Sequence, residues 1–197
     1  MVDAGIGRLL ISSLHQGIAD VSPSRLDFYE TWLSPSGIRD GRLGLAPLGA
    51  VLSFVHREMP PANEQIPARA GCCAANWTYE ELSGLRRWCI RRLPVRLRSR
   101  VALRLGKRLV VATVNNSTVK SRKRGARAVV QIRSVLFKQL RDPWTLPMRG
   151  FYAAAFQRMF AHCGVNAEVG VTCTGPEGWS LDVTVKGAGP RFPADTA

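Results

Sequence analysis

Cys173 is the residue with the clearest potential for chemistry, because it precedes a turn between two strand-like runs. In VTCTGPEGWSLDV (171–183), β-favouring residues flank Thr-Gly-Pro-Glu-Gly. A thiolate at such a turn could bind a metal or enter a redox reaction. The chain has five cysteines, an odd number, and they form no CxxC pair. This pattern favours a reducing, cytoplasmic compartment over a disulfide framework.

The histidines do not add a metal-binding motif. His15, His56 and His162 lie far apart, and none belongs to HxxxH or HExxH. A zinc site needs about four converging ligands, and GxSxG and GxxxxGK are also missing from the sequence. We therefore expect no metal, no other cofactor and no catalytic residues, although the sequence leaves open whether the chain is an enzyme.

Positive charge is concentrated in one part of the chain. The net charge is +14, and residues 82–141 hold 18 of the 28 Lys and Arg and no acid. Such polarisation predicts a face that attracts polyanions, either an anionic membrane surface or nucleic acid; a solvated face without a partner is the alternative. The predicted polyanion-binding residues form a period-four row and a hairpin tip: Arg96, Arg100, Arg104, Arg108, Arg122, Lys123 and Arg124.

Aromatic residues crowd two predicted helices. Phe151, Tyr152 and Phe156 lie in a helix over 150–164 that is bounded by glycines, and Trp32 lies in an earlier helix. Neighbouring residues on a helix point about 100° apart, so these aromatics cannot share one face. We predict that the four line an apolar pocket for a hydrophobic small molecule, with the N–H groups at Gly150 free to bind its polar end. A filled core is the alternative.

The order of elements sets the fold. Helical spacing and proline positions predict helices over 5–19, 22–33, 47–60, 62–77 and 82–92 and from 95 onward, followed by a hairpin, a helix and a second hairpin. This order predicts an α+β fold in which N-terminal helices pack on a four-stranded antiparallel sheet made of the two hairpins. We expect one domain over 1–186, with a helical part (1–114) and a hairpin-helix-hairpin part (115–186), and a disordered tail over 187–197. The chain shows neither a signal peptide nor an apolar run long enough to span a bilayer.

The C-terminal part of the chain contains, in order, the strand VVQIRSVLF, the helix GFYAAAFQRMF, the strand GVNAEVGVTC and the last strand WSLDVTV. Through this order of features, residues 115–186 resemble the 4-vinyl-reductase domain family, which is related to subunits of the TRAPP trafficking complex. The resemblance implies a cavity between helices and sheet that holds an apolar ligand. In zinc-binding phenol sensors of this kind, two cysteines and an acid hold the metal. Here Cys173 matches the first cysteine, whereas Ser180 and Gly170 replace the other two ligands, so we expect no zinc.

These observations together predict a non-catalytic domain that senses or carries a hydrophobic or tetrapyrrole-like ligand. The resemblance leaves a second option, a bacteriochlorophyll 4-vinyl reductase or its accessory factor, and the charge leaves a third, a basic nucleic-acid-binding protein. A homodimer is one option for the assembly. The sequence does not choose the ligand.

Overall fold

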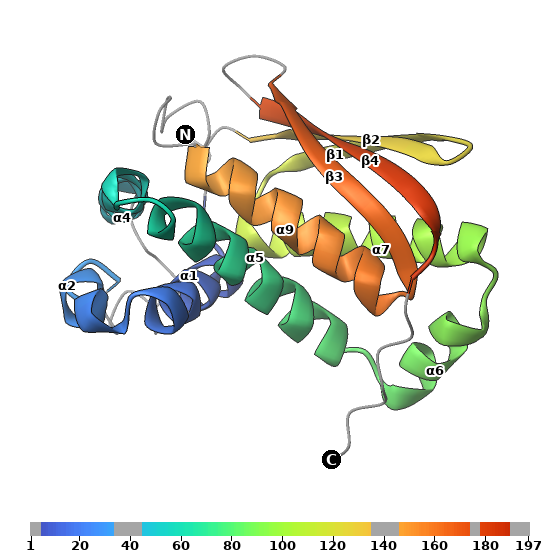
Figure 1. Ribbon diagram of the computed structural model, residues 1–197, viewed down its shortest axis with the longest axis horizontal. Coiled ribbons are helices and arrows are strands. Elements are labelled where there is room, and N and C mark those ends of the chain that lie inside the picture. The colour runs from blue at the N-terminus through green and yellow to red at the C-terminus, as the bar shows by residue number, and fades with distance from the viewer. Residues whose placement is uncertain (1–4, 34–44, 135–145, 174–177, 190–197) are drawn as a thin grey trace.

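A computed structural model describes residues 5–33, 45–134, 146–173 and 178–189 (Figure 1). Helices come first and are followed by a hairpin, a helix and a hairpin. The helical elements are α1 (Arg8–Val21), a 3-10 turn (Pro23–Arg25), α2 (Leu26–Glu30), α4 (Leu45–Arg57), α5 (Ala62–Glu80), α6 (Gly84–Arg92), α7 (Val95–Thr113) and α9 (Leu146–His162). The strands are β1 (Thr118–Arg124), β2 (Arg127–Arg133), β3 (Val165–Cys173) and β4 (Gly178–Ala188).

The two hairpins form one antiparallel sheet. The strand order is β1-β2-β4-β3, and the pairing of β2 with β4 places Val130 opposite Leu181. Along β2, buried Ala128, Val130 and Ile132 alternate with exposed residues, which is the period of a strand that has one covered face. The predicted α+β fold class is thereby confirmed.

The helices build up in layers over that covered face. Helices α7 and α9 contact the sheet, α5 packs on α9, and α1 packs on α5 (Figure 1). Gly71 of α5 permits this close packing, because a Cβ atom there would lie 2.1 Å from the carbonyl oxygen of Phe151. Consequently α9 is covered by the sheet on one side and by α5 on the other.

Several element boundaries differ from those expected from the sequence. The helix expected over 22–33 consists of the 3-10 turn and the short α2. Helix α5 runs through Pro67, which lies in its second turn, and continues to Glu80. Helix α9 begins at Leu146, four residues before Gly150. Strand β4 extends to Ala188, and the remainder of the expected tail, from Pro190, lies outside the described residues.

Within the described ranges, no helix combines the length and the apolar character that crossing a bilayer requires.

Candidate functional site

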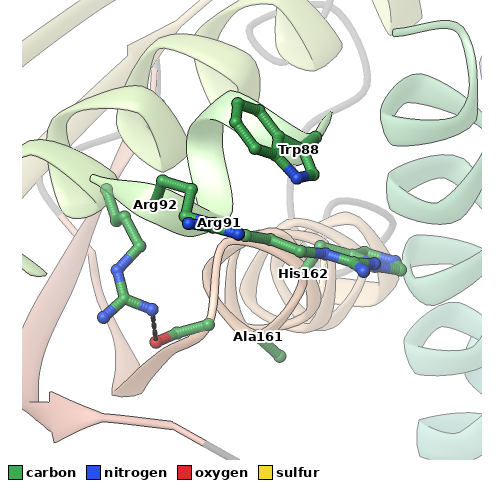
Figure 2. Close-up of a pocket in the computed structure, with 7 residues that line it drawn as sticks. Trp88, Arg91, Arg92, Ala161 and His162 are labelled. Atoms are coloured by element: carbon green, nitrogen blue, oxygen red, sulfur yellow. Dashed lines mark hydrogen bonds between the residues drawn. The ribbon is translucent and has the colours of Figure 1, made fainter. Parts of the chain in front are cut away.

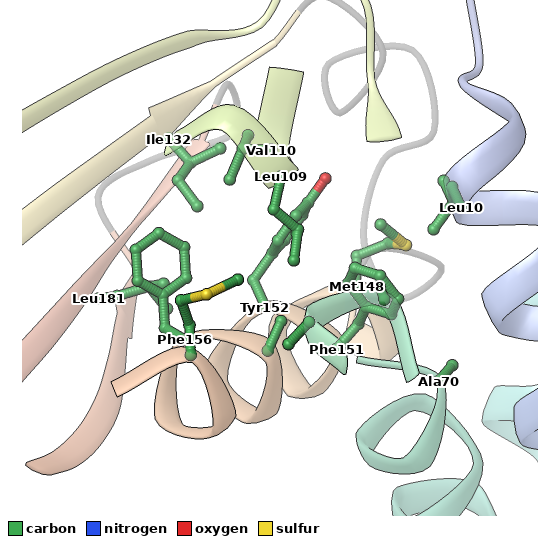
Figure 3. Packing of buried hydrophobic residues seen from close by; sticks show 14 of the residues in the cluster. Leu10, Ala70, Leu109, Val110, Ile132, Met148, Phe151, Tyr152, Phe156 and Leu181 are labelled. Atoms are coloured by element: carbon green, nitrogen blue, oxygen red, sulfur yellow. The ribbon is translucent and has the colours of Figure 1, made fainter. Parts of the chain in front are cut away.

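The aromatic residues of α9 belong to the packed core. Phe151 and Tyr152 are fully buried and Phe156 is 1% exposed. Figure 3 shows Tyr152 and Phe156 among side chains of α7 and the sheet, and Phe151 beside α5 and Met148. The Tyr152 hydroxyl lies 2.8 Å from the Thr113 hydroxyl, and burial raises the pKa of Tyr152. Because α9 is covered on two faces, neighbouring aromatics that point about 100° apart are both buried.

Trp32 does not join these three residues. It follows α2, is 40% exposed, and packs against Phe54 of α4 at a ring distance of 5.7 Å. The N–H groups at Gly150 are not at a helix entry either, since α9 begins four residues earlier. The structure therefore does not bring Trp32 together with Phe151, Tyr152 and Phe156, and their binding of a ligand stays a prediction.

The basic residues divide between two surfaces. Arg96, Arg100, Arg104 and Arg108 are exposed along α7, as their spacing predicts, and Arg108 pairs with Glu81 at 3.1 Å. On β1, Lys123 is half-buried, whereas Arg122 and Arg124 on either side of it are exposed. Successive residues of a strand point to opposite faces, so Lys123 turns towards α7 and its two neighbours turn away from it.

An open cavity of about 460 Å³ lies between α6 and the C-terminal end of α9 (Figure 2). Helix α6 contributes Trp88, Arg91 and Arg92, and α9 contributes Ala161 and His162. Arg98 from α7 and Gly164 complete the lining. Among the described lining residues three are arginines and none is acidic, so the cavity is strongly positive.

Hydrogen bonds and ring contacts hold this lining in place. Arg98 donates from Nη1 to the carbonyl oxygen of Gly164 at 2.9 Å, next to the end of α9. His162 Nε2 lies 2.8 Å from Asn76 Oδ1, and the imidazole stacks on Tyr79 at 4.6 Å with an interplanar angle of 10°. The guanidinium of Arg92 lies 4.8 Å from the ring centre of Trp88.

This arrangement is suited to binding a ligand. Trp88 is 55% exposed and offers a flat apolar surface, and guanidinium groups bind carboxylates and phosphates in a bidentate manner. The cavity can therefore accept a flat molecule that carries acidic groups.

Cys173 belongs to β3, and its backbone pairs with Trp179. Ser180 and Gly170 stand where the phenol sensors have their other two zinc ligands. In the pairing of β3 with β4, Ser180 lies opposite Thr172 and Gly170 lies opposite Asp182. In the described part of the chain, no three or more His, Cys, Asp or Glu residues lie together in a group that could hold a metal ion. The absence of zinc stays a prediction.

Sequence reasoning did not assemble this cavity. The run RRWCIRR (86–92) combines a tryptophan with four arginines, which is a usable signal for an aromatic and basic site. Arg98 and His162 carried no such signal, because they meet α6 only through the packing of α7 and α9. Pattern analysis of one segment does not show this contact.

No protein-family model matches the chain, and no curated protein matches it. Its fold is similar to that of an H-NOX protein from K. algicida, whose Fe(II) unliganded structure has a TM-score of 0.59 at 8% sequence identity. The A71G mutant of that protein gives a TM-score of 0.61 at 10% identity. Both comparisons cover 92% of this chain and 97% of the other. At such low identity, this likeness establishes the fold alone.

Proposed function

We propose that this chain is a non-catalytic domain that senses or carries a small molecule, and that the ligand binds in the cavity between α6 and α9. The ligand class is a planar, largely hydrophobic ring system with acidic groups, of which a tetrapyrrole with carboxylate side chains is an example. The observation that carries the proposal is the convergence of Trp88, His162 and three arginines on one open cavity.

The size and chemistry of the cavity support this ligand class. Ligand pockets commonly measure roughly 300–1,000 Å³, and this one measures about 460 Å³. The exposed face of Trp88 can stack on a ring, while Arg91, Arg92 and Arg98 can pair with its acidic groups. Because none of the described lining residues is acidic, an uncharged hydrophobic molecule would leave the charge of three guanidinium groups uncompensated, so acidity is part of the proposed ligand.

Two likenesses support the class of function without naming the ligand. The H-NOX fold covers nearly the whole chain, and residues 115–186 resemble 4-vinyl-reductase domains, which we retain as part of the proposal. Vinyl-reductase activity is not part of the proposal, which is restricted to binding of the ligand by the cavity.

The H-NOX structures are described as Fe(II) forms, and a similar iron centre here would need donor residues in this chain. His162 is the histidine of the cavity, and its Nε2 is held by Asn76 at 2.8 Å. His15 Nε2 lies 2.8 Å from Glu30 Oε1, in α1, away from the cavity. The described residues also provide no metal-binding group of three. These donors do not fit an iron centre, and the proposal therefore contains no iron.

The proposal is tested by titrating the protein with hemin, metal-free protoporphyrin IX and flavin mononucleotide. Tryptophan fluorescence and ligand absorbance report the binding. We expect saturable binding of at least one compound, and similar affinities for hemin and protoporphyrin IX because no metal ligand is involved. Trp88→Ala and Arg92→Gln should each weaken binding about tenfold or more.

Trp32→Ala is the matched control, since Trp32 is another partly exposed tryptophan that packs on α4, at the opposite end of the fold from α6 (Figure 1). It should leave affinity unchanged. Binding that depends on Trp32 and not on Trp88, or no saturable binding of any of the three compounds, would overturn the proposal. Much tighter binding of hemin than of protoporphyrin IX would show that iron is ligated after all.

A further inference from the structure

A second cavity, of about 500 Å³, lies between the first turns of α7 and the turn that joins β1 to β2. Its polar side chains are those of Arg96, Ser99, Arg100 and Lys123. The remaining lining residues are small or aliphatic: Val95, Gly125, Ala126 and Val185. We propose that this cavity is a binding site for a phosphate group, carried either by a phosphorylated small molecule or by a lipid headgroup. The proposal is independent of the ligand cavity at α6 and α9.

Lys123 is fixed in position at this site. Its ammonium group donates to the Ser99 hydroxyl and, at 3.4 Å, to the carbonyl oxygen of Arg96. Ser99 is itself 1% exposed and donates to the same carbonyl at 2.8 Å. A charged group that is held by neutral acceptors is preorganised for an anion, because it loses little side-chain freedom on binding.

Among the described residues, no carboxylate neutralises the positive charge at this cavity. No ion pair in the described structure joins a carboxylate to Arg96, Arg100 or Lys123. Burial, together with repulsion from Arg100 and Arg96, lowers the pKa of Lys123. A bound anion would relieve this repulsion and favour the charged form of the lysine.

The first turn of α7 adds to the positive electrostatic potential at this cavity. The helix spans 19 residues and begins at Val95, after Pro94. The first N–H groups of a helix have no partner within it and form its positive end. Val95 and Arg96, the first two residues, both line the cavity, so the backbone favours an anion at the place where the side chains do.

The concave shape and the strand alternation select a compact anion over a long polymer. Lys123 faces the cavity, whereas Arg122 and Arg124 point to the opposite face of the sheet. An extended nucleic-acid backbone would use the exposed arginines of that opposite face at least as well. A phosphate group, in contrast, can be enclosed by Arg96, Arg100 and Lys123 together.

Isothermal titration of the whole chain with inorganic pyrophosphate, at fixed low salt, is the direct test. Lys123→Gln and Arg100→Gln should each weaken binding about tenfold or more, and Lys123→Arg should recover most of the affinity. Arg122→Gln is the matched control, because it removes the same charge from the neighbouring position on the other face. It should change the affinity less than about twofold.

Vesicle sedimentation distinguishes the two sources of phosphate. Phosphatidylcholine vesicles with and without phosphatidic acid would be tested on the same variants. Lys123-dependent binding of pyrophosphate assigns the site to small molecules, and Lys123-dependent binding confined to phosphatidic acid assigns it to a lipid headgroup. Equal losses in Lys123→Gln and Arg122→Gln, or no binding in either assay, would overturn the proposal. Lys123→Gln should remain folded, since it removes a repelled charge, and circular dichroism checks this.

Discussion

The sequence predicts binding in two regions, of an apolar ligand around α9 and of polyanions along α6 and α7. In the structure the first region is packed and the second contains open cavities. Around α9, Phe151, Tyr152 and Phe156 fill the space between α5 and the sheet. Along α6 and α7, Trp88 and the arginines line open cavities. The difference lies in coverage. A helix enclosed on two sides uses its aromatics for packing. In contrast, α6 lies at the edge of the fold (Figure 1), and the charged side chains of α6 and α7 line open cavities.

The largest expected effect is on the interior side of this comparison. Phe156→Ala should lower the free energy of unfolding by roughly 3–5 kcal/mol, because the buried ring contacts α7 and the sheet. Trp88→Ala should lower it by less than about 1 kcal/mol, because the side chain is 55% exposed. Urea unfolding of both variants measures this. Similar losses would mean that the two regions do not differ in packing.

The thiol of Cys163 gives a second test of burial around α9. Burial raises the pKa of Cys163 to about 12, although nearby Arg98 opposes the shift. The unfolded thiol ionises near the ordinary pKa of 9.0, so the protein loses stability as pH rises above that value. At about pH 11 this thiol alone should cost about 3 kcal/mol relative to neutral pH.

Unfolding free energies measured between neutral pH and about pH 11 check the Cys163 prediction. Cys163→Ala should flatten the alkaline decline. Cys89→Ala is the control, because Cys89 is exposed, and it should leave the decline as in the unmodified protein. A decline that is the same in all three proteins would contradict the prediction.

Substitution of two glycines should have intermediate effects on stability and compares the packing of α5 against α9 with that of α6. Gly71→Ala places a Cβ atom 2.1 Å from the Phe151 carbonyl oxygen, so α5 and α9 must separate, at a cost of about 1–3 kcal/mol. Gly84 is the first residue of α6, and the Cβ atom that Gly84→Ala adds meets nothing within 4 Å. It should be neutral or stabilise by up to about 1 kcal/mol. Thermal unfolding distinguishes the two, and a destabilising Gly84→Ala would show that α6 is more tightly packed than the structure indicates.

Some parts of the structure could be predicted from the sequence because they depend on local signals. The strand alternation of β2, the glycine-bounded end of α9 at Gly164 and the period-four arginine row all appear in the structure. These features follow from backbone periodicity and turn chemistry. They are sufficient to give the α+β class.

The candidate site could not be predicted because it depends on contacts between distant segments. The excess of aromatics in 150–160 suggested a pocket, but α5, nearly eighty residues earlier, covers the second face of α9. The cavity near Trp88 likewise needs Arg98 and His162, which only tertiary packing brings together. In the sequence the basic residues form one continuous zone, whereas in the structure strand alternation separates Lys123 from Arg122 and Arg124.

The smallest effect on stability should come from the outward arginines of the hairpin. Arg122 and Arg124 are exposed, and no ion pair in the described structure involves them. The double variant Arg122→Gln/Arg124→Gln should therefore change the free energy of unfolding by less than about 0.5 kcal/mol. Retention on heparin should nevertheless fall, and its dependence on salt should become shallower, because two fewer cations release counterions on binding.

Lys123→Gln provides the contrast for the heparin experiment. It removes one charge from the cavity face and should affect heparin retention less than the double variant, while affecting pyrophosphate binding more. If Arg122→Gln/Arg124→Gln leaves heparin retention and its salt dependence unchanged, the outward face of the hairpin is a solvated surface and plays no part in polyanion binding. If both proteins lose heparin and pyrophosphate binding in parallel, the two faces act as one diffuse field, and the division of charge by strand alternation has no functional consequence.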